Sequence, residues 1–248
     1  MLTFFRHIRK SLLGSGQVRK YLVYAIGEIA LVVIGILIAL QINNWNQQRI
    51  DSSKRQDYIK LLLRDLSKDT MMLNSGIMEM TSIINQQDEL RKRMSSELAT
   101  SDTLLKIAKY EINPMLEIQD AYSFNTNTIT SLLATGQLEL FDQEIADELL
   151  SLNTMQQEAI QEFNDNWTVF SLLIAEYARD FRFNTRLNLI QGGPLLELAW
   201  EDPNMTGLAN TVASIGGSKS FITEWGIDNL RTIKKQTLRT IELLYSYE

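Results

Sequence analysis

Positions 25–42 read AIGEIALVVIGILIALQI, an apolar run interrupted by two glycines and by one carboxylate, Glu28. The run extends over residues 21–42, and a helix of this length spans about 33 Å at roughly 1.5 Å per residue. That length matches the hydrocarbon core of a bilayer. We therefore predict a transmembrane helix over residues 21–42, with the lipid bilayer as its first partner.

Aromatic residues stand at both ends of this run. Tyr21 and Tyr24 lie at one end and Trp45 at the other, where interfacial anchors are expected. A cleaved signal peptide is the rival interpretation, but its apolar region would be shorter and would end in a small-x-small site. Here the run continues into LQINNWN, so we favour a retained signal-anchor.

The charges on the two sides of the run predict its orientation. Residues 1–20 carry five basic residues and no acid, whereas residues 43–248 carry 19 basic and 29 acidic residues. The positive-inside rule then predicts a bacterial inner-membrane protein with a cytoplasmic N-terminus and a periplasmic domain of residues 43–248. The acidic domain would be repelled by nucleic acid, so we expect no nucleic-acid partner.

Residues 1–20 form a basic, cytoplasmic segment with amphipathic spacing. Leu2, Phe5, Ile8 and Leu12 recur at helical intervals, which suits a helix lying on an anionic leaflet. A disordered positive tail that merely sets the topology is the equal alternative.

Glu28 shares one face of the predicted transmembrane helix with small residues. Steps of three and four residues give the predicted packing face: Ala25, Glu28, Val32, Gly35 and Ala39. Gly35 and Ala39 form a small-xxx-small pair that lets two backbones approach closely. A charged carboxylate is costly in hydrocarbon, so we expect a neutral carboxyl that hydrogen-bonds to a neighbouring helix or to Tyr24.

Three roles for Glu28 remain open. The first, which we favour, is interhelical hydrogen bonding in a homo-oligomer. The second is contact with another inner-membrane protein. The third is a proton relay, for which one acid without a basic partner is weak support.

Two stretches resemble a family of uncharacterised single-span membrane proteins from Bacteroidota. They are KYLVYAIGEIALVVIGILIALQINNWN at 20–46 and TSLLATGQLELFDQEIADELL at 130–150, although Ala146-Asp147 departs from the Leu-Arg pair expected there. The resemblance implies a membrane-anchored helical protein of unknown function across the whole length, and it carries over no catalytic residues.

The periplasmic domain is predicted to be all-α, a helical bundle with one long membrane-proximal helix at 55–99. A heptad seam supports this helix, with interruptions at Asp69, Gly76 and Gln87. The seam consists of Ile59, Leu62, Leu66, Leu73, Met80, Ile83, Leu90 and Met94. Either the seam packs within the chain's own bundle, which we favour, or it forms a parallel coiled coil continuing from the membrane.

Capping and breaking residues predict the remaining helices. Ser101 or Asp102 is expected to cap a short helix ending at Glu111. The other predicted helices are 121–135, ended by Gly136; 143 to about 183, capped by Asp142; and 204–215 and 218–246, separated by Gly216-Gly217.

Catalytic chemistry is almost absent from the sequence. There is no cysteine, and the only histidine, His7, lies outside the predicted domain, which excludes histidine triads and histidine or thiolate metal sites there. The acidic pairs Asp142/Glu144 and Asp147/Glu148 fit a solvated helix face, and the aromatic residues from Trp167 to Phe183 fit a core.

We therefore predict no enzyme activity, no cofactor and no metal. The predicted function is a scaffold or interaction protein that oligomerises through its span. The alternative is a sensor-like module whose helical domain binds a small ligand and is coupled to the transmembrane helix.

Overall fold

The computed structural model describes residues 18–117, 122–181, 190 and 192–247, with side chains from Leu22 onward. All elements within these residues are helical, which confirms the predicted all-α fold class. The chain divides into two compact units, Met1–Asp57 and Tyr58–Glu248. The predicted amphipathic side chains at Leu2, Phe5, Ile8 and Leu12 lie outside the described residues.

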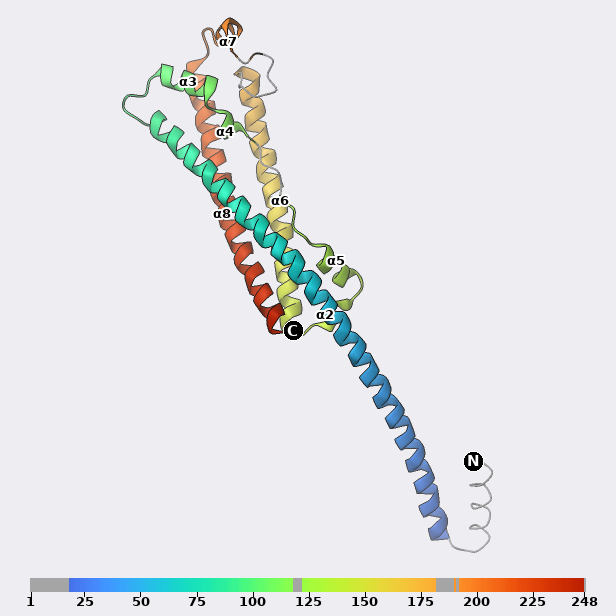
Figure 1. The fold of residues 1–248 in the computed structure, drawn as a ribbon. Helices are drawn as coiled ribbons and strands as arrows, with labels where there is room; N and C mark the ends of the chain where they lie inside the picture. The colour runs from blue at the N-terminus through green and yellow to red at the C-terminus, as the bar shows by residue number, and fades with distance from the viewer. Residues whose placement is uncertain (1–17, 118–121, 182–189, 191, 248) are drawn as a thin grey trace. The chain divides into compact units, whose positions relative to one another are not determined.

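Helix α2 (Val18–Met94) contributes residues to both units (Figure 1). The separate helices predicted at 21–42 and 55–99 are thus one continuous helix. Asn43, Asn44 and Asn46 end the apolar run, but asparagine costs only a few tenths of a kcal/mol in a helix interior and does not break it. The predicted end at residue 99 is also corrected to Met94.

In the first unit, α2 is long and apolar enough to cross a membrane, by length and composition. None of its most apolar 18-residue window is buried by the rest of the chain. This part of α2 is therefore a candidate membrane anchor.

The second unit is built on three long helices: α2 from Tyr58 onward, α6 (Gln143–Asp180) and α8 (Met205–Ser246). Figure 1 shows α6 and α8 side by side, with α2 crossing them. Short elements connect these helices: α3 (Ser101–Tyr110), α4 (Asn113–Leu116), α5 (Asn127–Ala134), the 3₁₀ helix η1 (Gln137–Leu140) and α7 (Pro194–Ala199).

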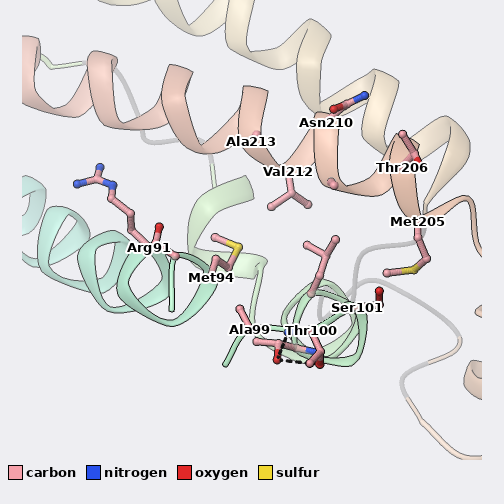
Figure 2. A pocket seen from close by; sticks show the side chains of 14 residues that line it. Arg91, Met94, Ala99, Thr100, Ser101, Met205, Thr206, Asn210, Val212 and Ala213 are labelled. Carbon is pink, nitrogen blue, oxygen red and sulfur yellow. Dashed lines mark hydrogen bonds between the residues drawn. The ribbon is translucent and has the colours of Figure 1, made fainter. Parts of the chain in front are cut away.

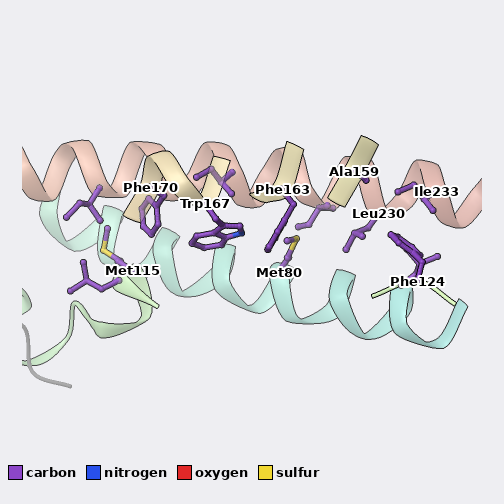
Figure 3. Close-up of a cluster of buried hydrophobic side chains, with 14 of the residues drawn as sticks. Met80, Met115, Phe124, Ala159, Phe163, Trp167, Phe170, Leu230 and Ile233 are labelled. Carbon is purple, nitrogen blue, oxygen red and sulfur yellow. The ribbon is translucent and has the colours of Figure 1, made fainter. Parts of the chain in front are cut away.

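The predicted seam of α2 is buried inside this bundle. Ile59, Leu73 and Met80 are fully buried, and Ile83 and Met94 are partly buried. On α6, the rings of Phe163, Trp167 and Phe170 follow one another with centroids 5.6 and 5.2 Å apart (Figure 3). The seam therefore packs within the chain's own bundle, the first of the two interpretations.

Glycines allow α2 and α8 to approach closely. A Cβ added at Gly226 of α8 would lie 2.7 Å from Cε of Met80, and one added at Gly76 of α2 would lie 3.0 Å from Cδ1 of Leu230. Each helix thus receives a side chain of the other where it has no side chain of its own. Gly76, which interrupts the heptad seam, is therefore a packing position.

The predicted break in the last helix is wrong, because α8 continues through Gly216 and Gly217. A Cβ at Gly216 would lie 2.9 Å from Cε of Met115, so this glycine accommodates α4 rather than ending α8. Tertiary packing here overrides the low helix propensity of glycine.

Two other predicted boundaries change, and a third is confirmed. Thr100, not Ser101 or Asp102, caps α3, through a capping box with Thr103. The helix predicted from residue 121, which lies outside the described residues, begins at Asn127; Gly136 follows it in the left-handed conformation, as predicted. Asp142 is the N-cap position of α6, as predicted, but its side chain makes no capping hydrogen bond.

Candidate functional site

The predicted packing face lies on a continuous stretch of α2. The helical backbone places Ala25, Glu28, Val32, Gly35 and Ala39 on one side. Val32, Gly35 and Ala39 are exposed, and a Cβ at Gly35 would meet no atom within 4 Å; Ala25 and Glu28 are half-buried. The structure shows that there is space beside Gly35, while packing across this face stays a prediction.

The predicted interfacial anchors border the same stretch. Tyr24 and Trp45 are both exposed, and the side chain of Tyr21 lies outside the described residues. Tyr24 and Trp45 are separated along the continuous helix by about 32 Å, at roughly 1.5 Å per residue. This is compatible with one aromatic side chain at each interface of a bilayer.

The second unit contains an open cavity of about 670 Å³ between the end of α2, the start of α3 and the start of α8 (Figure 2). Met94, Met205 and Val212 supply apolar wall, and Thr100, Thr206 and Asn210 supply polar wall. Among the described residues that line the cavity, Arg91 is the only charged one, and its guanidinium already binds Asp88 and Ser220. The described wall of the cavity is thus a mixture of apolar and mostly uncharged polar side chains.

Lys219 is a buried cation in the middle of the bundle. It is fully buried, and its Nζ lies 4.3 Å from the centroid of the Trp167 ring. The ammonium donates to the backbone carbonyl of Glu117. Burial lowers the pKa of Lys219 to about 8, against the opposing effect of the carboxylates of Glu117 and Glu79. The interaction joins α8 to α6 and to the segment after α4.

A layer of buried and half-buried polar side chains, here called the polar layer, joins α2 to α6 and to the start of α5. Its members are Asp65, Asp69, Thr128, Asn153 and Gln156, which are buried, and Asn125, which is half-buried. Asp69 accepts hydrogen bonds from Asn125 N (2.8 Å), Asn125 Nδ2 (2.7 Å) and Gln156 Nε2 (3.2 Å). Thr128 donates to Asp65 Oδ2. These bonds hold Asn125 and Thr128, on either side of the start of α5, against α2.

The polar layer was not identified from the sequence, which marked Asp69 only as an interruption of the seam. A signal was present, because Asp65 and Asp69 are one turn apart on a helix whose apolar side was already assigned. Acidic residues so close to a buried stripe need donors from elsewhere in the chain. Gln87 follows the same logic, since its Oε1 accepts from Ser220 Oγ of α8.

The acidic pairs and the described aromatic residues considered in the sequence analysis lie on helix surfaces or in the core. Glu148 is buried and its Oε1 lies 3.2 Å from Nε of Arg239, while Asp142, Glu144 and Asp147 are exposed. Trp167, Phe170, Tyr177 and Phe181 are buried core residues, and Phe183 lies outside the described residues. Within the described part of the chain, no group of three or more His, Cys, Asp or Glu is placed to hold a metal ion.

Part of the chain matches a known protein family. Residues 28–143 match a family of unknown function (DUF6090). The match covers most of the apolar run, the rest of α2 and the corner around Gly136. No curated protein and no solved structure matches the chain. The predicted resemblance to a family of unknown function is confirmed for residues 28–143. The origin of that family in Bacteroidota stays a prediction.

Proposed function

We propose that the chain is a membrane-anchored interaction protein, without enzyme activity, that self-associates through the packing face of α2. In this proposal α2 is a retained signal-anchor of a bacterial inner membrane. The N-terminus lies in the cytoplasm and the helical bundle in the periplasm, where it holds a protein partner at the membrane.

The observation that supports the proposal most strongly is the uncovered apolar surface of α2. None of the apolar window is buried by the chain itself, whereas the bundle has an extensive core of its own. Exposed apolar helices of this length need lipid or another helix as cover. The small residues on one side favour a second helix over lipid as cover on that side, because close approach of the two backbones increases van der Waals contact.

Disulfide crosslinking in membranes tests self-association, because the chain has no cysteine of its own. Ala39→Cys places a thiol on the packing face, and Leu37→Cys places one on the opposite side of the same turn. We expect Ala39→Cys to form a homodimer under mild oxidation and Leu37→Cys to form much less. Equal crosslinking of the two variants would contradict a specific face. Ala39→Cys crosslinking to a different protein would instead support a hetero-oligomer.

The second candidate function is a ligand sensor, and the cavity of about 670 Å³ is the observation that favours it. A small molecule bound there would contact α2, α3 and α8 together. Native mass spectrometry of the purified chain should then find a stoichiometric small molecule, which Ala209→Trp removes by filling the cavity. A stoichiometric protein partner without a small molecule would favour the interaction protein.

A further inference from the structure

A second, much smaller cavity lies inside the polar layer. Its volume is about 20 Å³, and its polar wall consists of Asp65, Asp69, Asn125, Asn153 and Gln156. Leucine and isoleucine side chains of α2, α5 and α6 form the rest of the wall. A volume of roughly 10–15 Å³ is enough for one water-sized occupant, so the cavity has room for one such occupant.

Three N–H groups on this wall donate to one carboxylate. The backbone and side-chain N–H groups of Asn125 and the Nε2 of Gln156 point to the carboxylate of Asp69. Asp69 Oδ2 accepts only the last of these among the described residues, and a carboxylate oxygen can accept two. Asp69 Oδ2 can therefore accept from, or coordinate, an occupant of the cavity.

Asn153 shows this excess of oxygen independently of the two acids. Its side chain is 9% exposed, and its buried Oδ1 has no hydrogen-bond partner among the described residues. A buried carbonyl oxygen without a partner costs about 1–3 kcal/mol, so native structures rarely leave one so. An occupant that offers positive charge or a donor would satisfy Asn153 and Asp69 together.

The charge of the layer favours a cation over a neutral water molecule. Asp69 is 1% exposed, and no Lys or Arg in the described part of the chain forms an ion pair with it. Asp65 has Arg64 as a partner at 3.2 Å, but that guanidinium is largely exposed. Burying a carboxylate without a counter-charge is costly, and a cation in the cavity reduces that cost.

The ligand atoms and the volume select among cations. Carboxylate and amide oxygens are hard ligands, which suit Na⁺, K⁺, Mg²⁺ and Ca²⁺ rather than metals that prefer sulfur or nitrogen. Mg²⁺ usually keeps several waters, for which the cavity has no room, and Ca²⁺ takes six to eight oxygens, more than Asp65, Asp69 and Asn153 supply. We propose that the cavity among Asp65, Asp69 and Asn153 binds a single dehydrated Na⁺ that joins α2 to α6.

A cation bound only in the folded state stabilises it by mass action. The test is thermal unfolding of the full chain in detergent micelles, followed by circular dichroism. NaCl is raised from 1 to 300 mM, with choline chloride holding the ionic strength constant. We expect the Tm to rise by about 2–4 °C. An equal concentration of KCl should give a smaller rise.

Asn153→Leu removes a ligand at nearly constant volume and should abolish the Na⁺-dependent rise in Tm. Asn164→Leu changes an exposed asparagine of the same helix and should keep the rise. If Asn153→Leu does not fold, Asp65→Asn keeps the shape of the wall and should raise the Na⁺ midpoint at least tenfold. An unchanged Tm of the unmodified chain in NaCl would show that the cavity holds only water. An equal rise in Asn153→Leu, or a larger rise in CaCl₂, would also overturn the proposal.

Discussion

The two parts of helix α2 differ in what surrounds them. In the second unit, Leu73 is fully buried and the polar interruptions Asp69 and Gln87 have partners on other elements of the same chain. In the first unit, Leu37 is 59% exposed and its apolar neighbours surround the helix on all sides. A one-sided stripe marks a helix covered by its own fold, whereas all-round apolarity marks one covered by something else.

The largest expected contrast comes from truncating one leucine in each part. Leu73→Ala leaves a cavity in the bundle core and should lower the free energy of unfolding by about 2–5 kcal/mol. Leu37→Ala should change the stability of the bundle by less than about 0.5 kcal/mol, as is usual for exposed sites. Urea unfolding in detergent micelles measures both. Similar losses for the two variants would break the distinction between the covered and uncovered parts.

Two glycines of α8, Gly226 and Gly217, differ in whether α2 packs against them. Gly226→Leu must displace Met80 of α2 and should destabilise the bundle by about 1–3 kcal/mol. Gly217→Leu has no atom within 4 Å of its new Cβ, so it should be neutral or slightly stabilising through helix propensity. The same unfolding experiment compares them. A destabilised Gly217→Leu variant would mean that the position is a real helix boundary.

The buried Lys219 predicts how stability depends on pH. Its pKa is lowered to about 8 in the folded chain from 10.5 for ordinary lysine, so between these values the unfolded state binds more protons. Stability should therefore rise with pH over this window, by about 1–3 kcal/mol in total. Lys219→Met should flatten this rise relative to the unmodified chain. Parallel pH profiles would show that Lys219 does not titrate as described.

The smallest expected change in stability concerns the N-cap residues of α3 and α6. Thr100→Ala removes the capping box of α3 and should cost about 1 kcal/mol. Asp142→Ala removes no capping hydrogen bond and should cost less than about 0.5 kcal/mol. A reversed order in urea unfolding would restore Asp142 as the stronger cap.

The sequence predicted the features that depend on periodicity. The seam of α2 and the aromatic core residues of α6 follow from 3.6-residue spacing, whereas the apolar run follows from its length; the structure confirms the helical form of all three. Gly136 was predictable for a similar reason, because a glycine after the last apolar position of a helix commonly adopts the left-handed conformation.

The features that depend on contacts between distant residues were not predictable in this way. Gly216 looks like a helix breaker until Met115 is placed beside it. Asp69 looks like an error in a seam until Asn125 and Gln156, far along the chain, donate to it. Local propensity cannot reveal such contacts, so the polar layer, the cavities and the environment of Lys219 needed the structure.

Glu28→Gln separates the possible roles of the carboxyl in the uncovered part. The amide keeps the size and a hydrogen-bond donor, so we expect the variant to retain assembly and function. A proton relay would not tolerate the change, since an amide cannot cycle between charged and neutral forms. Normal assembly with lost function would therefore identify Glu28 as a titrating site.

The central claim is that the packing face of α2 joins the transmembrane helices of two copies of the chain. Crosslinking of Ala39→Cys in membranes, with and without Gly35→Leu, tests it most directly. The leucine fills the open side of Gly35, which should block close backbone approach. We predict that the disulfide-linked dimer is lost while the Tm of the bundle is unchanged. A dimer that forms equally well with Leu at position 35 would contradict the claim.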